Sequence, residues 1–226
     1  MTLPGKVIEV PPATRGFDCN AHLSVYAAAQ FRMQGHRFAV RYVGRTKQNP
    51  QDITASEASG ILGAGLGIML VQHVHPDSET TGWSPTAALG KQYGAFAAQS
   101  AVDVGVRAGT TLWSDLEGVK PGTDHRDVIA FCNYWLDQVG HAGYTPGLYV
   151  GFACGLTAIE LHSRLRFSHY WGAYNLNADQ VPAVRGIEMK QGLQKTLDGI
   201  QYDPDTVQRD LLGGLPLMQV DMEWTP

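Results

Sequence analysis

Short apolar runs of strand type alternate with segments of helical periodicity along the whole chain, and this alternation limits the folds open to it. Eight strand-like runs stand out, at residues 15–19, 38–43, 67–73, 110–118, 146–151, 167–174, 187–191 and 200–202. Strands that alternate with helices build a parallel sheet whose faces the helices cover. Eight such units in 226 residues predict an α/β fold, a compact (β/α)₈ barrel of the TIM type, with a doubly wound open sheet as the alternative.

Helical periodicity fills the intervals between those runs. Segments 22–34, 54–63, 86–108, 123–142 and 153–165 carry apolar residues at helical spacing, and Thr54 with Glu57 is typical of a capping box. A last helical turn is expected at about residues 206–212, before a proline-bearing tail. Because no linker or repeat interrupts the series, we expect one domain, with an extension at 1–14, the barrel at 15–214 and a tail at 215–226.

The charge and cysteine content exclude several classes of partner. Lys and Arg number 17 against 21 Asp and Glu, a net charge of −4, and no basic cluster occurs, so nucleic acid is not expected as a partner. No run reaches the roughly 18 apolar residues that a membrane span needs, and no signal peptide is visible. Cys19, Cys132 and Cys154 have the spacing of neither a disulfide framework nor a zinc site. We expect synthesis in a reducing cytoplasm, no membrane insertion and no cofactor.

Two acids end the strand-like stretch Thr-Thr-Leu-Trp-Ser-Asp-Leu-Glu-Gly at residues 110–118. Because alternate side chains of a strand share a face, Asp115 and Glu117 point the same way, with Cα atoms about 6.5–7 Å apart. Such a pair is suited to acid/base chemistry, although acids at a strand end also meet solvent or cap a helix. Asp18 ends the first strand in the same way, with an N-cap of the helix near residue 22 as its alternative role.

The sequence concentrates acids and aromatic residues at the carboxyl ends of the expected strands. In a (β/α)₈ barrel these ends form the face that carries function, so the concentration predicts a site there. The residues in question are Asp18, Tyr42, His73, Asp115, Glu117, Tyr149, Trp171, Tyr174, Gln191 and Asp203.

These residue types point to the chemistry of glycoside cleavage. A neighbouring negative charge and burial both raise a carboxyl pKa, so Glu117 can stay protonated and act as general acid. Asp115, Asp18 or Asp203 would stay ionised and stabilise an oxocarbenium-like centre. The aromatic residues are either core residues or a stacking wall for sugar rings, formed by Tyr42, Tyr149, Trp171 and Tyr174.

Three other features of the sequence bear on the kind of site. His73 and His75 share a face, but no third ligand has a metal-site spacing, so no metal is expected. The glycines at 63, 65 and 67 precede a strand, so they do not form a phosphate-binding loop. The loop at 75–85, with Trp83, is expected to form a rim that could contact a ligand.

The order of these motifs resembles the family-25 glycoside hydrolases, the bacterial and phage N-acetylmuramidases. The motifs are Gly16-Phe17-Asp18, Asp115-x-Glu117, Leu148-Tyr149, Trp171-x-Ala173-Tyr174 and Gln191. Over residues 15–214 the chain is more similar still to the Rv2525c-like, glycoside hydrolase-like family of unknown function. The resemblance implies that Glu117 is the proton donor, supported by Asp115, Asp18 and an aspartate of the last strand.

Two positions depart from the muramidase pattern. Lys190-Gln191 stands where a Trp-Gln pair is usual, and the last-strand Asp-x-Asn is matched by Asp203-Pro204-Asp205 or, in another register, by residues 208–210 with Gln208 at the acid position. In the first register Asp205 is expected to bind substrate.

The resemblance implies cleavage of the β-1,4 bond between N-acetylmuramic acid and N-acetylglucosamine in peptidoglycan. Since no signal peptide is visible, the first hypothesis is a phage lysin or antibacterial effector that a holin or a secretion machine releases. Two alternatives stay open. One is a non-catalytic barrel that binds a glycan or a partner protein, and the other is an amidase or a different glycosidase.

Overall fold

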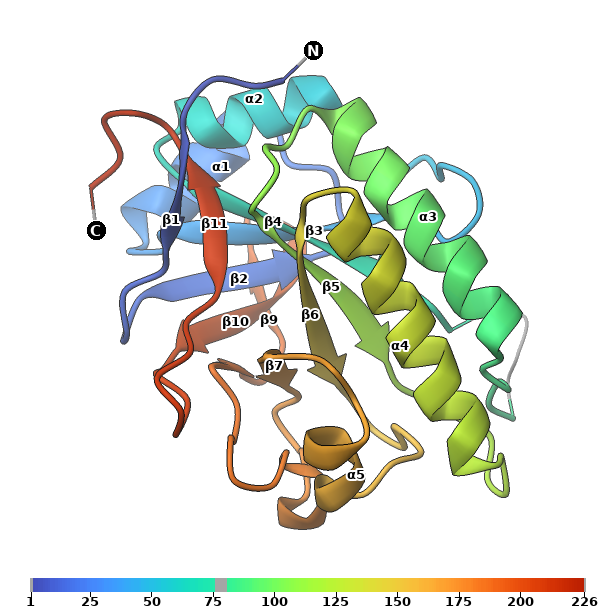
Figure 1. Cartoon of the computed structure of the whole chain (residues 1–226). Helices are drawn as coiled ribbons and strands as arrows, with labels where there is room; N and C mark the ends of the chain where they lie inside the picture. The colour runs from blue at the N-terminus through green and yellow to red at the C-terminus, as the bar shows by residue number, and fades with distance from the viewer. Residues whose placement is uncertain (1, 76–80, 226) are drawn as a thin grey trace.

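Eight strands close into a barrel in the computed structural model, which describes residues 2–75 and 81–225 (Figure 1). The expected (β/α)₈-type barrel in one domain is therefore confirmed. Hydrogen-bonded neighbours follow one another around the barrel, and the last strand pairs with the first. In this order the strands are β2 (Arg15–Cys19), β3 (Phe38–Val43), β4 (Gly67–His73), β5 (Thr111–Leu116), β6 (Thr145–Val150), β7 (His169–Gly172), β8 (Met189–Gln191) and β10 (Ile200–Val207).

The closing strand β10 runs antiparallel to both of its neighbours, whereas the other seven strands are parallel. Asp203 lies opposite Asp18 of β2, and Asp205 lies opposite Gln191 of β8. β10 therefore starts at the mouth, where the parallel strands end, and runs down the barrel wall.

The helical turn expected at about residues 206–212 is wrong. Thr206 belongs to β10 and pairs with β2 and β8, so two ladders of hydrogen bonds outweigh a weak helical pattern. The chain then turns at Asp210, whose Oδ1 accepts hydrogen bonds from the backbone N–H groups of Leu212 and Gly214 at 2.9 and 2.6 Å.

Side-chain caps begin the five α-helices of the described residues. Ser24, Thr54, Thr86, Asp124 and Thr157 each accept a hydrogen bond from a backbone N–H of the first turn. The helices are α1 (Val25–Met33), α2 (Ala55–Gly63), α3 (Ala87–Val104), α4 (His125–His141) and α5 (Ala158–Ser163), and a 3₁₀ turn η1 follows at Ala178–Gln180. Across 2–75 and 81–225, no helix is long and apolar enough to cross a membrane.

Three further strands lie outside the ring. β1 (Lys6–Glu9) pairs antiparallel with β11 (Leu217–Val220), and β11 reaches β4 through Gln219 and Ile68. β9 (Lys195–Leu197) forms a hairpin with the start of β10. The segments expected as an extension and a tail thus contain ordered strands.

The barrel interior is filled below the mouth. Trp113, Trp171, Met69 and Met218 belong to one buried inner cluster. Glycines make room for them: a Cβ on Gly147 would lie 2.3 Å from the Trp113 ring. Because Met218 belongs to β11, the β1–β11 pair covers the end of the barrel opposite the mouth. The mouth is therefore the open end of the barrel.

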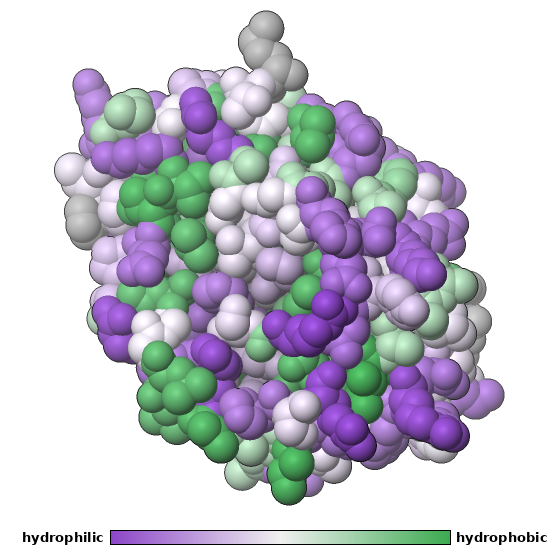
Figure 2. Space-filling model, in the orientation of Figure 1, coloured by the Kyte–Doolittle hydropathy of each residue, from purple (hydrophilic) through white to green (hydrophobic). Residues whose placement is uncertain are grey.

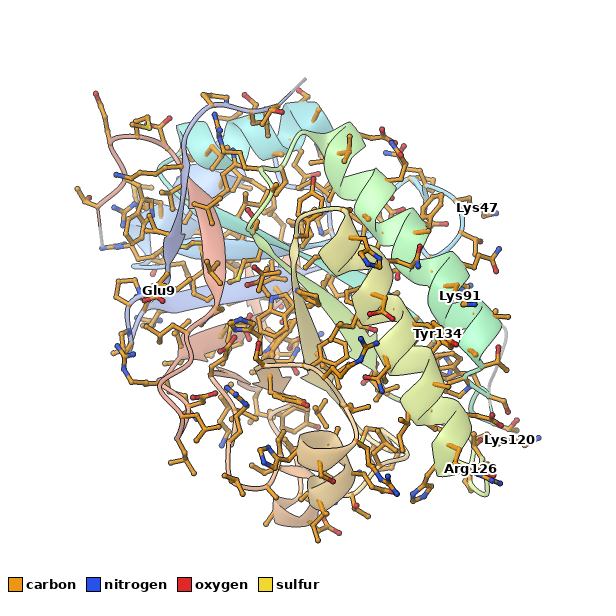
Figure 3. The ribbon with its side chains drawn as sticks, viewed as in Figure 1. Glu9, Lys47, Lys91, Lys120, Arg126 and Tyr134 are labelled. Carbon is orange, nitrogen blue, oxygen red and sulfur yellow. The ribbon has the colours of Figure 1, made fainter. Side chains whose placement is uncertain are left out.

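The helices cover the outer side of the barrel with a second apolar layer. α3 and α4 lie side by side, because Gly90 and Gly94 of α3 leave no space for a Cβ against the α4 backbone (Figure 1). Lys91 of α3 and Tyr134 of α4 make a cation–π contact of 4.4 Å on their outer side (Figure 3). The face in Figure 2 carries several separate apolar patches among polar residues.

Candidate functional site

A cavity of about 190 Å³ opens at the carboxyl ends of the barrel strands. Its lining combines charged, polar and aromatic side chains contributed by seven strands of the ring and the residue after β5. The lining residues are Tyr42, Val71, His73, Asp115, Glu117, Tyr149, Trp171, Gln191 and Asp203. The structure thus brings together most of the residues that the sequence places at strand ends.

Asp115 is the buried centre of the cavity. It lies on β5, all of whose residues are buried, and its side chain is 4% exposed. Its Oδ2 lies 2.9 Å from Nδ1 of His73 on the neighbouring strand, and its Oδ1 has no hydrogen-bond partner among residues 2–75 and 81–225. A buried carboxylate oxygen without a donor is costly for a fold, so it points to a role beyond stability.

Loops on both sides hold the backbone of Glu117, the residue after β5. The Trp83 indole Nε1 donates to the Glu117 carbonyl at 2.8 Å, and the Gly118 N–H donates to the Phe152 carbonyl at 2.8 Å. A Cβ on Gly151 would lie 2.6 Å from both Cβ and Oε2 of Glu117, so only glycine fits there.

Trp83 itself is 2% exposed and packs edge-on against Phe131, with ring centroids 5.1 Å apart. Trp83 is therefore not the residue through which the expected rim loop contacts a ligand. Its indole is instead oriented towards the backbone that carries Glu117. Residues 76–80 of the same loop lie outside the described residues.

The environment of Glu117 keeps its carboxyl group protonated at neutral pH. The charge of Asp115 is the largest cause, burial is the second, and together they raise the pKa of Glu117 to about 8, against a lowering effect of His73. The direction agrees with the prediction from the Asp-x-Glu spacing. A protonated carboxyl group beside an ionised one is the arrangement that general acid catalysis needs.

Asp18 lies on β2 and is 2% exposed. It accepts hydrogen bonds from Gln191 Nε2 at 3.0 Å and from the Tyr42 hydroxyl at 3.1 Å. Burial raises its pKa to about 7, with added repulsion from Asp203 and Asp115, while the two hydrogen bonds lower it. Its alternative role as a helix cap is wrong, because Ser24 caps α1.

Asp203 and Asp205 lie on the same face of β10 but at different depths. Asp203 lines the mouth, half-buried, and burial raises its pKa. Asp205 is 1% exposed beneath the cavity, and burial with the charge of Asp18 raises its pKa well above the usual range. It does not line the cavity where substrate binding was expected. Gln208 is exposed and donates to the Ile187 carbonyl, so the register with Asp203 at the acid position is the one that forms.

The aromatic residues do not form a single wall. Tyr42 stacks on His73 with ring centroids 4.2 Å apart and an interplanar angle of 27°. Tyr149 donates its hydroxyl to Gln191 Oε1 at 2.9 Å and contacts Trp171, which is 1% exposed. Tyr149 and Trp171 therefore form the floor. Tyr174 is 52% exposed and lies outside the cavity lining.

Metal binding finds no support in the described part of the chain, where no group of three or more His, Cys, Asp or Glu side chains could hold an ion. His73 contacts Asp115, while the carbonyl of His75 accepts from Arg45 at 2.7 Å. All three cysteines are buried free thiols, and burial raises the pKa of Cys19 to about 12, so none is suited to act as a nucleophile.

Two further cavities extend the mouth into a trough. A cavity of about 540 Å³ shares Tyr42, His73 and Asp203 with the first cavity and reaches the β9–β10 hairpin. A cavity of about 340 Å³ shares Asn20 and His73 with the second and reaches Arg45. A trough of this form suits an elongated ligand.

Sequence reasoning missed the hairpin that forms one side of this trough. Asp198 and Gly199 between β9 and β10 have φ angles of 49° and 80°. An Asp-Gly pair with both φ angles positive is the signature of a tight hairpin turn, so the signal was present in the sequence. Arg45 and Lys47, the basic residues after β3, were missed as well, because isolated Arg and Lys residues carry no pattern.

Comparisons with known proteins agree with this geometry. The family model described as the Rv2525c-like, glycoside hydrolase-like domain matches residues 29–198. The Tat-secreted protein Rv2525c of Mycobacterium tuberculosis, solved with L-tartrate, has a TM-score of 0.64 at 16% identity, over 86% of this chain and 95% of that one.

Two glycoside hydrolase structures are similar as well. A family 25 glycosyl hydrolase from Bacillus anthracis has a TM-score of 0.58 at 14% identity, over 86% of this chain and 88% of that one. A muramidase from Trichobolus zukalii has a TM-score of 0.54 at 18% identity, over 87% and 94%. No curated protein matches in sequence. Identities this low establish the shared fold alone.

Proposed function

The chain belongs to the Rv2525c-like, glycoside hydrolase-like domain family, and from this membership and the geometry of the mouth we propose that it hydrolyses a peptidoglycan-type glycan. The observation that carries the proposal is the carboxyl pair on β5. Asp115 is buried with one unpartnered oxygen, and beside it the pKa of Glu117 is raised to about 8. The relatives named muramidases support the choice of glycan.

In this proposal Glu117 donates its proton to the oxygen of the scissile β-1,4 bond. The bond between the sugar carbon and this oxygen breaks, and the carbon gains positive charge, which nearby carboxylates stabilise at low cost because they are already held in place by the barrel. A water molecule then adds to the sugar carbon and gives a proton to a carboxylate of the site. Asp115 and Asp203 line the same cavity as Glu117, and Asp18 lies next to it. His73 holds one oxygen of Asp115 at 2.9 Å and so fixes the orientation of that carboxylate.

The test is digestion of purified peptidoglycan, with the products identified by mass spectrometry. Wild type should release fragments with reducing-end muramic acid. Glu117→Gln keeps the shape of the side chain and removes its proton, so we expect a loss of about 10²- to 10⁴-fold in rate. Glu9→Gln, on β1 at the opposite end of the barrel, removes an exposed acid and should leave the rate unchanged (Figure 3).

A second candidate is a barrel that binds a glycan without cleaving it. The exposed Lys190 favours this candidate, because it stands where the resemblance predicts a sugar-stacking tryptophan, and Trp171 is too deeply buried to replace it. Measurable glycan binding with no product from wild type would support the binding protein and exclude the hydrolase. Free peptide amines in place of reducing sugars would identify an amidase.

The proposed activity also implies a place of action. A hydrolase of this kind would act on the cell wall after release by a holin or a secretion machine, as a phage lysin or antibacterial effector does. Lysis of cells by the purified protein added from outside, but not by Glu117→Gln, is the expected result.

A further inference from the structure

The trough that leads from the carboxyl cluster ends in a basic pocket, and this pocket has no part in the chemistry described above. It is the cavity of about 340 Å³ beside the segment that joins β3 to α2. Arg45 and Lys47 supply its positive charge, and Asn20, Asn49 and Gln51 supply polar groups. His73 lines both this pocket and the carboxyl cavity, so the two ends of the trough are connected.

The basic segment is held firmly against the barrel. Gln72 Nε2 donates to the carbonyls of Gly44 and Arg45 at 2.9 and 3.3 Å, and the Ile53 N–H donates to the Tyr42 carbonyl at 3.0 Å. The Arg45 side chain is itself fixed, because its Nη1 donates to the His75 carbonyl at 2.7 Å. A guanidinium held in this way needs little further ordering to bind an anion.

The charge that the pocket exposes to a ligand is positive. Its acidic residue, Asp52, is 5% exposed, and its Oδ2 is occupied by the backbone N–H and side-chain amide of Asn49 at 2.6 and 3.2 Å. Lys47 is exposed, and its side chain points outward from the loop (Figure 3). The trough therefore runs from negative charge at Asp115 and Asp203 to positive charge at Arg45 and Lys47.

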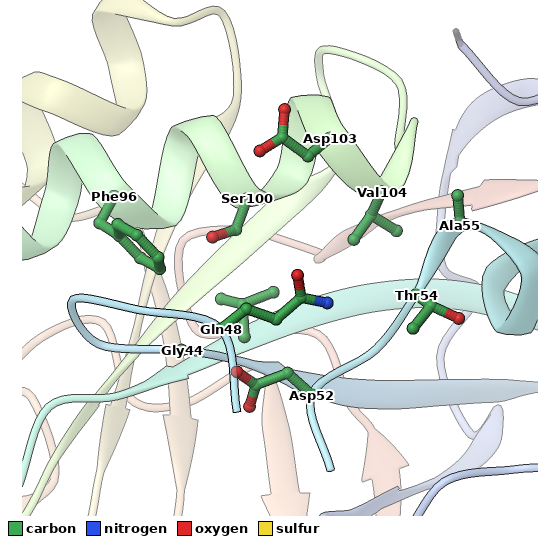
Figure 4. Close-up of a pocket in the computed structure, with 10 residues that line it drawn as sticks. Gly44, Gln48, Asp52, Thr54, Ala55, Phe96, Ser100, Asp103 and Val104 are labelled. Atoms are coloured by element: carbon green, nitrogen blue, oxygen red, sulfur yellow. The ribbon is translucent and has the colours of Figure 1, made fainter. Parts of the chain in front are cut away.

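A cavity on the other side of the same segment shows the contrast. It has about 250 Å³ and lies between this segment and α3, lined by Gln48, Phe96, Ser100 and the acids Asp52 and Asp103 (Figure 4). It contains no basic side chain and none of the mouth carboxylates. Of these two cavities, the one on the mouth side is therefore the favourable place for an anionic ligand group.

We propose that Arg45 and Lys47 form a subsite for a carboxylate carried by the glycan, so that the protein selects acidic glycans over neutral ones with the same β-1,4 backbone. This inference rests on the proposed function. In peptidoglycan the carboxylate comes from the lactyl group of muramic acid or from the peptide attached to it. A carboxylate approaching the acids of the mouth would be repelled, so this subsite also fixes the direction in which the glycan lies.

The test measures binding, by calorimetry, in a Glu117→Gln background that leaves the glycan uncut. Three ligands are compared: glycan chains stripped of peptide, which carry free lactyl carboxylates; disaccharide–peptides; and chitotetraose, which is neutral. In that background, Arg45→Gln/Lys47→Gln should weaken binding of acidic ligands by about 10- to 100-fold, as loss of charge-assisted hydrogen bonds does, and chitotetraose by less than about twofold.

Two further variants serve as controls. Lys6→Gln/Arg164→Gln removes the same charge from exposed positions outside the trough and should leave all three affinities unchanged. Lys47→Gln alone keeps the hydrogen bond from Arg45 to the His75 carbonyl. It should weaken the binding of acidic ligands by a smaller factor than the double variant. This variant therefore separates the effect of lost charge from that of a distorted loop. The losses should shrink in high salt.

The pattern of affinity losses across the three ligands tests the subsite. A selective loss for the stripped glycan supports a lactyl contact, and a selective loss for the disaccharide–peptide supports a peptide contact. Equal losses for acidic and neutral ligands, or no loss at all, would overturn the subsite while leaving the hydrolase intact. Absence of binding by every glycan to the Glu117→Gln protein would overturn the proposed function together with the subsite.

Discussion

Glu57 and Asp115 are both buried carboxylates near the same rim of the barrel, but they differ in the hydrogen-bond donors that surround them. Glu57 is 3% exposed and accepts from Arg41 Nε at 2.7 Å and from the Leu23 N–H at 2.9 Å, with His22 Nδ1 at 2.7 Å. Asp115 is 4% exposed, has His73 at 2.9 Å, and faces a second acid, Glu117.

The difference separates a structural carboxylate from a functional one. Donors from β3 and from the loop before α1 surround Glu57, so its charge is compensated where the fold needs it. The mouth instead collects acids without a matching number of cations, and that arrangement costs stability. Proteins retain such uncompensated groups where activity requires them.

The largest expected effect comes from breaking the structural pair. Arg41→Met should lower the free energy of unfolding by about 3–5 kcal/mol, because it leaves the carboxylate of Glu57 buried without its cation. Arg41 also donates to the carbonyls of Cys19 and Gln51, which would lose a partner too. Urea denaturation measures the change. An exposed control, Arg164→Met, should change the free energy of unfolding by less than about 0.5 kcal/mol.

The next effect concerns the position of the functional acid. Gly151→Ala places a methyl group where Cβ and Oε2 of Glu117 stand, at 2.6 Å, so the carboxyl group must move. We expect the hydrolysis rate to fall by about 10²-fold, as misplacement by about 1 Å does. Gly63→Ala is the control, because Gly63, like Gly151, does not have a positive φ, and nothing lies within 4 Å of the added Cβ. Similar rate losses in the two variants would show that the clash with Glu117 is not the cause.

Asp115→Asn should lower the pKa of Glu117 and so change the pH dependence of hydrolysis. The charge of Asp115 is the largest cause of the raised pKa of Glu117, so its removal should move the alkaline limb of the kcat/KM profile to lower pH by about 1–3 units. Residual activity must be measured across the pH range. An unmoved alkaline limb would mean that another group controls it.

The smallest effect is on stability as a function of pH. Glu117 and Asp18 have folded-state pKa values of about 8 and about 7, above those of an unfolded chain. The folded state therefore binds more protons than the unfolded state between about pH 4 and 8, and the stability from these groups falls as pH rises through this window. Thermal melts of wild type should show this loss, and Asp18→Asn/Glu117→Gln should reduce it.

The sequence predicted the bounds of barrel strands whose residues are mainly apolar. It did not predict the bounds of a strand whose structure depends on pairing with its neighbours. The runs at 15–19, 38–43 and 67–73 coincide with β2, β3 and β4. The last strand was expected only at residues 200–202, but β10 continues through Asp203, Pro204 and Asp205 to Val207. It is a strand because β2 and β8 lie on either side of it, and no local pattern reveals those neighbours.

The sequence predicted most of the residues that line the cavity, but not every role of the surrounding carboxylates. Residues at strand ends converge on the mouth because the barrel geometry requires it. The role of Glu57 was mistaken: Thr54 accepts from the Glu57 N–H, but the Glu57 carboxylate turns to Arg41 in place of completing a capping box. A complete capping box forms at Thr157 and Glu160. The local spacing of residues could not show which of these two glutamates would bind a distant arginine.

The β1–β11 ladder has a mechanical consequence. Lys6 pairs with Val220 and Glu9 with Leu217, so the outer ends of both strands lie together. A force applied to residues 6 and 220 would separate the pairs of this ladder one after another, and it would reach the barrel through the bridge between Gln219 and Ile68. Tension on these two residues would therefore remove the cover at the closed end of the barrel before it disturbed the carboxyl cluster at the mouth.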